Sequence, residues 1–272
     1  MFWVILTVIC YMISSLGDKY ISKRLDCSPA QFSFIVSFFT AIWLGLTLPF
    51  TGVEFIFSGW NVFLLLALAG CKILEFYTSA LLLKTVSAYE LKAWLGINIL
   101  VSYAVGIVQS KYTFHWQVLV CGIFLMIGIF EIVREQKQVF RLTGLFLLFI
   151  LSKFGYGWLI AKMSGCRVTT TLFLVMVLVA LIQLPGVKLK EIVKKQGLIT
   201  GAVTRIPNAV GLFTESMAAM QSVFLYAMVQ PIQLALLFII SLIKKEKMGK
   251  RKFYGSLVCI LAVCLITVWT RK

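Results

Sequence analysis

Charged residues are scarce in this chain of 272 residues, and acidic residues are the scarcest. Asp, Glu, Lys and Arg make up 13% of the chain, apolar residues make up 61%, and the mean hydropathy is +0.98. A soluble domain has about 25% charged and about 45–50% apolar residues. So little polar surface cannot cover a core of this size, and disordered, collagen-like and coiled-coil chains are also more polar. The composition predicts an integral membrane protein.

Histidine and paired cysteines are also lacking. The chain has one histidine, His115, and its seven cysteines are scattered without a Cys-x-x-Cys pair. A tetrahedral zinc site needs clustered nitrogen and sulfur ligands. We therefore expect no metal site and no cofactor, and we interpret the cysteines as buried apolar thiols.

The chain lacks long polar segments as well, since the longest ones, 131–141 and 244–252, have the size of loops. A membrane-spanning helix needs about 20 residues, so ten spans use about 200 residues and leave no room for a soluble catalytic domain. The formal net charge is +16. Polytopic membrane proteins collect Lys and Arg in their loops, so we expect no nucleic-acid partner.

Ten apolar runs follow one another along the chain. They are continuous and rich in Leu, Ile and Phe, which favours helices over the alternating strands of an outer-membrane barrel. The first run has no basic region and no cleavage site before or after it, so we interpret it as a retained helix. The sequence predicts an all-α polytopic membrane protein with ten transmembrane helices at 2–22, 30–50, 58–82, 86–109, 116–133, 142–163, 168–186, 197–218, 221–243 and 253–270.

The two halves of the chain repeat each other. Matching residues recur in order at offsets of 135 to 139 residues, and they include Ser14/Ser152, Gly17/Gly155, Cys27/Cys166, Asn98/Gln233 and Cys121/Cys259. This pattern predicts two five-helix repeats, at 1–138 and 139–272. A unit of five crossings begins and ends on opposite sides of the membrane, so the second copy is inverted. Inverted repeats are typical of alternating-access transporters with a site near the midplane.

Three stretches of the sequence resemble a known group. They are Ser14 to Lys23 at the end of the first run, Pro231 to Gln233 in the ninth, and Lys244 to Met248 before Tyr254. With ten short-looped helices in two halves, the whole chain resembles the drug/metabolite transporter superfamily, and more closely its EamA-like members. The resemblance implies secondary transport or facilitated movement of small solutes, from amino acids to nucleotide sugars.

The chain departs from this family in its fourth run. Where the family often has proline, the chain has Gly96 or Ile97, and where the family has an acidic-basic turn, the chain has residues 109–112, Gln-Ser-Lys-Tyr. Residue roles in that half therefore transfer poorly from the family to this chain.

Ionisable residues at membrane depth cost roughly 2.5–3.5 kcal/mol each on insertion scales, which makes them functional candidates. Lys72 and Glu75 lie three residues apart, a spacing at which they can pair. Arg205 lies eight residues into its run near Pro207, which indicates a substrate or gate role. The predicted substrate-binding residues are Lys72, Glu75, Trp94, Asn98, Trp158, Arg205, Asn208, Tyr226, Gln230 and Gln233. The predicted gating or coupling residues are Asp18, Glu90, Lys92, Lys153 and Glu215.

Several of these candidates have a structural alternative. Asp18 and Glu90 can snorkel to the interface, and Lys72 with Glu75 can be an internal bridge. Trp94, Trp158 and Tyr226 either stack on a substrate or pack against lipid and protein. Pro231 with its flanking glutamines is either a tolerated kink or a cavity-lining bend, and we favour the bend.

Proton coupling also has two readings. Each buried carboxylate either carries a coupling proton or is permanently paired with a basic residue of the same run. The expected pairs are Glu75 with Lys72, Glu90 with Lys92, Glu215 with Arg205, and Asp18 with Lys19.

Two arguments give opposite orientations of the chain in the membrane. Loops after odd-numbered runs hold 17 Lys and Arg residues, whereas the remaining loops and the termini hold 5. The positive-inside rule therefore places both termini outside the cytoplasm, whereas the family implies that both are inside. We favour the charge count because it is a property of this chain.

These observations predict a secondary transporter, an exporter or exchanger that moves a small polar or amphipathic metabolite by alternating access. The alternatives are a lipid-linked sugar flippase of the same fold and a membrane-embedded lipid-modifying enzyme, which one histidine and short loops disfavour. We expect no enzymatic activity. The expected location is the plasma or inner membrane, the partners are the solute, the bilayer and a coupling proton, and the chain is a monomer or a homodimer.

Overall fold

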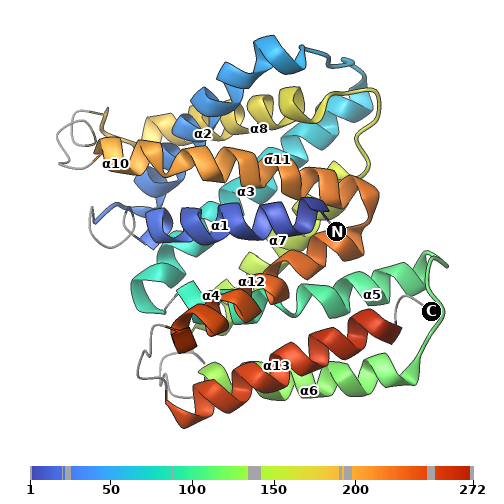
Figure 1. The fold of residues 1–272 in the computed structure, drawn as a ribbon. Coiled ribbons are helices and arrows are strands. Elements are labelled where there is room, and N and C mark those ends of the chain that lie inside the picture. The colour runs from blue at the N-terminus through green and yellow to red at the C-terminus, as the bar shows by residue number, and fades with distance from the viewer. Residues whose placement is uncertain are drawn as a thin grey trace.

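The computed structural model describes residues 2–19, 21, 26–86, 88–133, 142–189, 192, 198–243 and 249–269. Every regular element in these ranges is a helix (Figure 1). In chain order the elements are α1 (Phe2–Lys19), α2 (Pro29–Thr51), α3 (Gly59–Thr85), α4 (Ala88–Leu95), α5 (Asn98–Val108), α6 (Trp116–Val133), α7 (Thr143–Ile160), α8 (Val168–Gln183), the 3-10 turn η3 (Leu184–Gly186), α10 (Leu198–Val203), α11 (Arg205–Gln221), α12 (Val223–Ile243) and α13 (Lys250–Trp269).

Seven helical stretches are long and apolar enough to cross a membrane. They are Pro29–Thr51, Gly59–Thr85, Tyr89–Val108, Thr143–Ile160, Val168–Gly186, Val223–Ile240 and Lys250–Trp269. Phe2–Ser15 and Trp116–Ile132 are shorter apolar helices. Large apolar side chains also cover the outside of the bundle, and Phe50 and Phe57 are 90% and 82% exposed. Soluble monomers rarely present so much apolar surface. These features indicate a multi-pass integral membrane protein, in agreement with the composition.

The ends of α2 show how the sequence sets a helix boundary. The side-chain oxygen of Ser28 accepts a hydrogen bond from the backbone N–H of Gln31, and the backbone N–H of Ser28 donates one to Oε1 of Gln31. Pro29 fits the first turn of the helix, where its missing N–H is not needed. At the other end Gly52 has a φ of 77°, where a side chain would be strained, and its N–H binds the carbonyl of Leu48. Helix α2 therefore agrees with the predicted run 30–50 to within one residue at each end.

Two of the predicted runs are interrupted rather than continuous. Between α4 and α5 the backbone N–H groups of Gly96 and Ile97 bind carbonyls three residues earlier, at Ala93 and Trp94, which tightens the helix into a turn. Between α10 and α11 the interruption lies at Thr204, three residues before Pro207. Proline has no N–H to donate to the preceding turn, so the helix lacks a backbone hydrogen bond at this point and is interrupted there.

The helices pack mainly in four pairs. These pairs are α1 with α11, α3 with α7, α2 with α8, and α6 with α13. Figure 1 shows that α13 and α6 form one edge of the bundle and that α2 and α8 lie toward the opposite edge. The described ends of the chain, in α1 and α13, lie on the same side (Figure 1). Helix α1 lies between these edges, where it contacts α11 and α12.

The pair of α6 and α13 is held by a glycine contact. A Cβ atom on Gly255 would lie 2.8 Å from the backbone oxygen of Gly128, and one on Gly128 would lie 2.6 Å from the sulfur of Cys259. Small residues let helix backbones approach closely in a membrane, where packing replaces the hydrophobic driving force. These two glycines therefore set the distance between α6 and α13.

We predict that Gly255→Ala lowers the unfolding temperature of the detergent-solubilised protein. The added methyl group must push the two backbones apart, and overpacking of this kind costs about 1–3 kcal/mol. Gly70→Ala is the matched control, because a Cβ at the exposed Gly70 of α3 meets nothing within 4 Å. Equal unfolding temperatures for the two variants would contradict the close contact.

Candidate functional site

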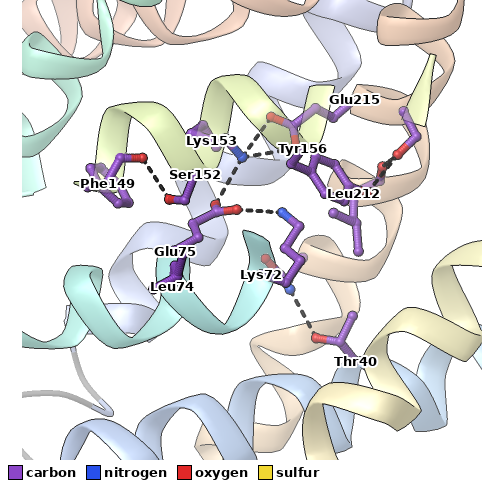
Figure 2. A network of polar contacts seen from close by, with 12 residues as sticks. Thr40, Lys72, Leu74, Glu75, Phe149, Ser152, Lys153, Tyr156, Leu212 and Glu215 are labelled. Carbon is purple, nitrogen blue, oxygen red and sulfur yellow. Dashed lines mark hydrogen bonds and ion pairs between the residues drawn. The ribbon is translucent and has the colours of Figure 1, made fainter. Parts of the chain in front are cut away.

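A buried lysine on α7 joins two carboxylates from two other helices. The ammonium nitrogen of Lys153 lies 3.1 Å from Oε1 of Glu75 on α3 and 2.9 Å from Oε1 of Glu215 on α11. Figure 2 shows both carboxylates pointing toward Lys153. Lys153 and Glu215 are 4% and 0% exposed. Because a lone charge inside the bundle is costly, the three groups stabilise one another.

Lys72 adds a second cation to Glu75. Its ammonium nitrogen lies 2.7 Å from Oε2 of Glu75, one helical turn away, so the pairing expected from their spacing is confirmed. The same nitrogen lies 3.9 Å from the centroid of the Tyr156 ring, within the range of a cation–π contact. The Tyr156 hydroxyl is hydrogen-bonded to Ser216 at 3.0 Å. Each polar end of this cluster therefore has a partner on a neighbouring helix.

Two further tyrosines support the cluster from α1 and α12. The hydroxyl of Tyr11 donates a hydrogen bond of 2.5 Å to Oε2 of Glu215. The hydroxyl of Tyr226 donates one of 2.5 Å to the backbone carbonyl of Lys153. The ring of Tyr226 lies against Gly157, where a Cβ atom would come within 2.4 Å of it. Gly157 therefore provides the space that Tyr226 needs to reach Lys153.

A second ion pair joins α1 and α11. Nη1 of Arg205 lies 2.6 Å from the carboxylate of Asp18, and the Arg205 side chain is fully buried. Next to it, the hydroxyl of Ser14 donates to the amide oxygen of Asn208, and the amide nitrogen of Asn208 donates to Thr40 on α2. Arg205 and Asn208 thus fix the first turn of α11 against α1 and α2.

These side chains surround a small polar cavity with a volume of about 60 Å³. Its wall is formed by the second half of α1, the start of α2, the second half of α3 and parts of α4, α7 and α11. The polar residues in the wall are Tyr11, Ser14, Ser15, Asp18, Lys72, Glu75, Ser79, Lys92, Lys153 and Asn208. Ionised groups from four helices, α1, α3, α4 and α7, therefore face one space inside an apolar bundle.

The structure brings many of the predicted site residues to this cavity. Six of them line it, namely Lys72, Glu75, Asn208, Asp18, Lys92 and Lys153. Three more bind lining residues from behind, namely Arg205, Glu215 and Tyr226. Arg205 is the first residue of α11 and Glu215 lies in its middle, so this helix supports the wall at two levels.

The other predicted residues lie elsewhere. Trp94 stacks on Phe146 with ring centroids 4.8 Å apart. Trp158 lies under the ammonium group of Lys162, at 3.8 Å. The amides of Asn98, Gln230 and Gln233 are buried on α5 and α12, outside the wall of the cavity.

The expected carboxylate pairs were only partly right. Glu90 forms its ion pair with Lys252 of α13, at 2.7 Å, and not with Lys92. Glu215 pairs with Lys153 and not with Arg205, whose partner is Asp18. The side chain of Lys19, the expected partner of Asp18, lies outside the described residues. These corrections have one physical reason, since pairs between helices depend on packing that spacing within a helix does not encode.

Sequence reasoning missed the tyrosines and serines of the wall. Tyr11, Ser14, Ser15 and Asp18 occupy positions i, i+3, i+4 and i+7 on α1, which places them on one helix face. This polar stripe in an otherwise apolar helix is the signal that identifies them. Tyr156 follows Lys153 by three residues and is part of the same kind of stripe on α7.

Comparison with family models and with curated proteins identifies no relative of this chain. No protein-family model matches the sequence, and no curated protein matches it. Among the described residues, no group of three or more His, Cys, Asp and Glu is placed to hold a metal ion.

We predict that Lys153→Met destabilises the protein strongly. It leaves Glu215 without its cation, and breaking a buried pair by removing one partner costs about 3–5 kcal/mol. The double variant Lys153→Met/Glu215→Gln recovers much of this loss, because Glu75 keeps Lys72. Unfolding temperatures of the single and double variants in detergent measure the coupling. Lys111→Met, at an exposed position after α5, is the control. A double variant no more stable than Lys153→Met would contradict the ion pair.

Proposed function

We propose that the protein is a secondary transporter, an exporter or exchanger, that moves a small polar or amphipathic solute by alternating access. The observation that carries this proposal is the polar cavity inside the bundle. Each ionised group at membrane depth costs roughly 2.5–3.5 kcal/mol on insertion scales. A cavity lined by Asp18, Lys72, Glu75, Lys92 and Lys153 is therefore expensive, and such groups typically mark a solute or ion pathway.

We further propose ten membrane crossings. Seven of the stretches are long and apolar enough, and one of these, Tyr89–Val108, combines α4 and α5 across their turn. The remaining three crossings are α1, α6 and the broken pair of α10 and α11. An even number of crossings agrees with the ends of α1 and α13 lying on the same side (Figure 1).

The helix pairs support an inverted repeat of residues 1–138 and 139–272. In such a repeat α1 corresponds to α7 and α3 to α11, so the pair of α1 with α11 corresponds to that of α7 with α3. Both pairs are among the most extensive in the bundle. The other two main pairs, α2 with α8 and α6 with α13, each join a helix to its own counterpart. A pseudo-two-fold axis produces this pattern.

A lipid-linked cargo fits this conformation less well. An apolar groove of about 550 Å³ lies between α2 and α8, lined on α2 by Phe34, Ile35 and Phe38. Phe32 and Val36 of the same helix line the polar cavity. Helix α2 thus separates the two spaces, which share no residue in their described linings. A lipid-linked molecule would need its head and tail on opposite sides of α2, so we favour a free solute.

The other parts of the proposal follow from the sequence. The resemblance to the EamA-like drug/metabolite transporters agrees with this arrangement, and we propose that the protein has no enzymatic activity.

The cavity lies nearest the side of the membrane where α1 ends, α2 begins and α3 ends. That side bears the loops after odd-numbered crossings, with 17 Lys and Arg residues. The positive-inside rule makes it the cytoplasmic side of a plasma or inner membrane.

We predict that the purified protein in proteoliposomes takes up members of a labelled panel of amino acids, amines and sugars. Glu75→Ala and Arg205→Ala reduce that uptake at least tenfold, because each leaves a charged partner, Lys72 or Asp18, unpaired in or beside the cavity. Their expression is expected to persist, and the same change at the exposed Lys111 is expected to leave uptake unchanged.

Measurement at several pH gradients adds a test of proton coupling to the same experiment. Uptake by both variants at the wild-type rate would contradict the assignment of the site. Turnover of labelled lipid donors by the purified protein, without uptake of any solute in the panel, would contradict transport and favour the lipid-modifying enzyme.

A further inference from the structure

One lysine of the cavity has no carboxylate partner in the part of the chain that the structure describes. Lys92 lies on α4 and lines the cavity, and among the described residues it forms no ion pair and no hydrogen bond. Its ammonium nitrogen lies 5.8 Å from the ring centroid of Tyr11. That distance is at the outer limit of a cation–π contact. Tyr11 alone therefore compensates the charge of Lys92 poorly.

The surrounding charges do not compensate Lys92 either. Lys153, Asp18, Glu75 and Glu215 act on it electrostatically from α7, α1, α3 and α11. Each of these three carboxylates is already bound by another cation, at 2.6 to 3.1 Å. The described residues in and around the cavity comprise three carboxylates and four cations, the fourth being Lys92. The site therefore has one excess positive charge.

The rest of the cavity wall is suited to a negatively charged group with an apolar body. Ser14, Ser15, Ser79 and Asn208 provide neutral polar groups close to the charges. The remaining wall is apolar and consists of Phe32, Val36, Phe76, Leu83, Leu91, Leu95, Phe149 and Leu212. The space open to water-sized groups in the cavity is about 60 Å³, which is enough for several water molecules. This conformation thus has room for a charged head group.

We propose that this cavity binds the anionic group, a carboxylate or a phosphate, of the transported solute, with Lys92 as its counter-ion. The inference rests on the proposed transport function and names the class of its substrate. An entering anion neutralises the excess charge, whereas a cation adds to it. The ion pairs of Lys72 and Lys153 leave Lys92 as the cation whose partner the solute supplies. Transport of an anion then needs no exchange of the existing pairs.

The first test measures access to Lys92 without transport. Lysines of the wild-type protein in detergent are reductively methylated with formaldehyde and borohydride, and the rate at each lysine is followed by peptide mass spectrometry. Sodium acetate, sodium phosphate and sodium chloride are compared at equal ionic strength. Acetate or phosphate is expected to slow the methylation of Lys92 several-fold relative to chloride. Lys111 is the control and is expected to react equally in all three salts. Equal rates at Lys92 would overturn the anion site.

The second test measures substrate class in proteoliposomes. Labelled glutamate and glycerol phosphate represent carboxylate and phosphate solutes, and choline and glucose represent cationic and neutral ones. Uptake is expected for an anionic solute, to fall at least tenfold in Lys92→Gln, and to be retained in Lys92→Arg and Lys111→Gln. The unfolding temperature of Lys92→Gln shows that the variant is folded.

The two proposals fail in different ways. Uptake of choline or glucose alone, unchanged in Lys92→Gln, would overturn the anion site while transport stands. Protection of Lys92 by anions without uptake of any solute would keep the anion site and count against transport.

Discussion

The ion pairs of Lys153 with Glu75 and Glu215 determine how the centre of this bundle is built. In a hydrocarbon environment a carboxylate separated from its cation has no water to replace it. Helices α7 and α11 therefore cannot move apart at this level unless another cation or water enters between them, whereas Glu75 of α3 also has Lys72 as a partner. The cavity lies beside this junction because the junction requires polar surroundings, which the tyrosines and serines of α1 and α7 provide.

The helices themselves could be predicted because a membrane requires continuous apolar runs. Their boundaries followed where capping residues such as Ser28 and Gly52 are present. The turn at Gly96 was harder to predict, since a glycine in a membrane helix is compatible with a continuous helix. The break at Thr204 likewise depends on local hydrogen bonds as well as on Pro207. Apolar content fixes where a segment lies, and backbone hydrogen bonding fixes whether it is straight.

The site could be predicted as a set of residues but not as a set of contacts. Glu75 and Lys72 are one turn apart, so their pairing can be read from the sequence. Lys153 and Glu215 are 62 residues apart and meet through the packing of α7 against α11. Tyr11 was missed because aromatic residues make up 14% of the chain, so that one more tyrosine is no signal by itself. Its role appears only when the polar face of α1 is considered as a whole.

Tyr226 gives the centre of the site a mechanical link to α12. Its hydroxyl binds the carbonyl of Lys153, and its ring occupies the space left by Gly157. That carbonyl belongs to the turn of α7 on which the Lys153 side chain is carried. A shift of α12 therefore acts on the Lys153 peptide of α7, one helical turn before Gly157. No described side chain of α12 lies in the cavity wall, yet a shift of α12 in this way changes the position of the Lys153 ammonium group.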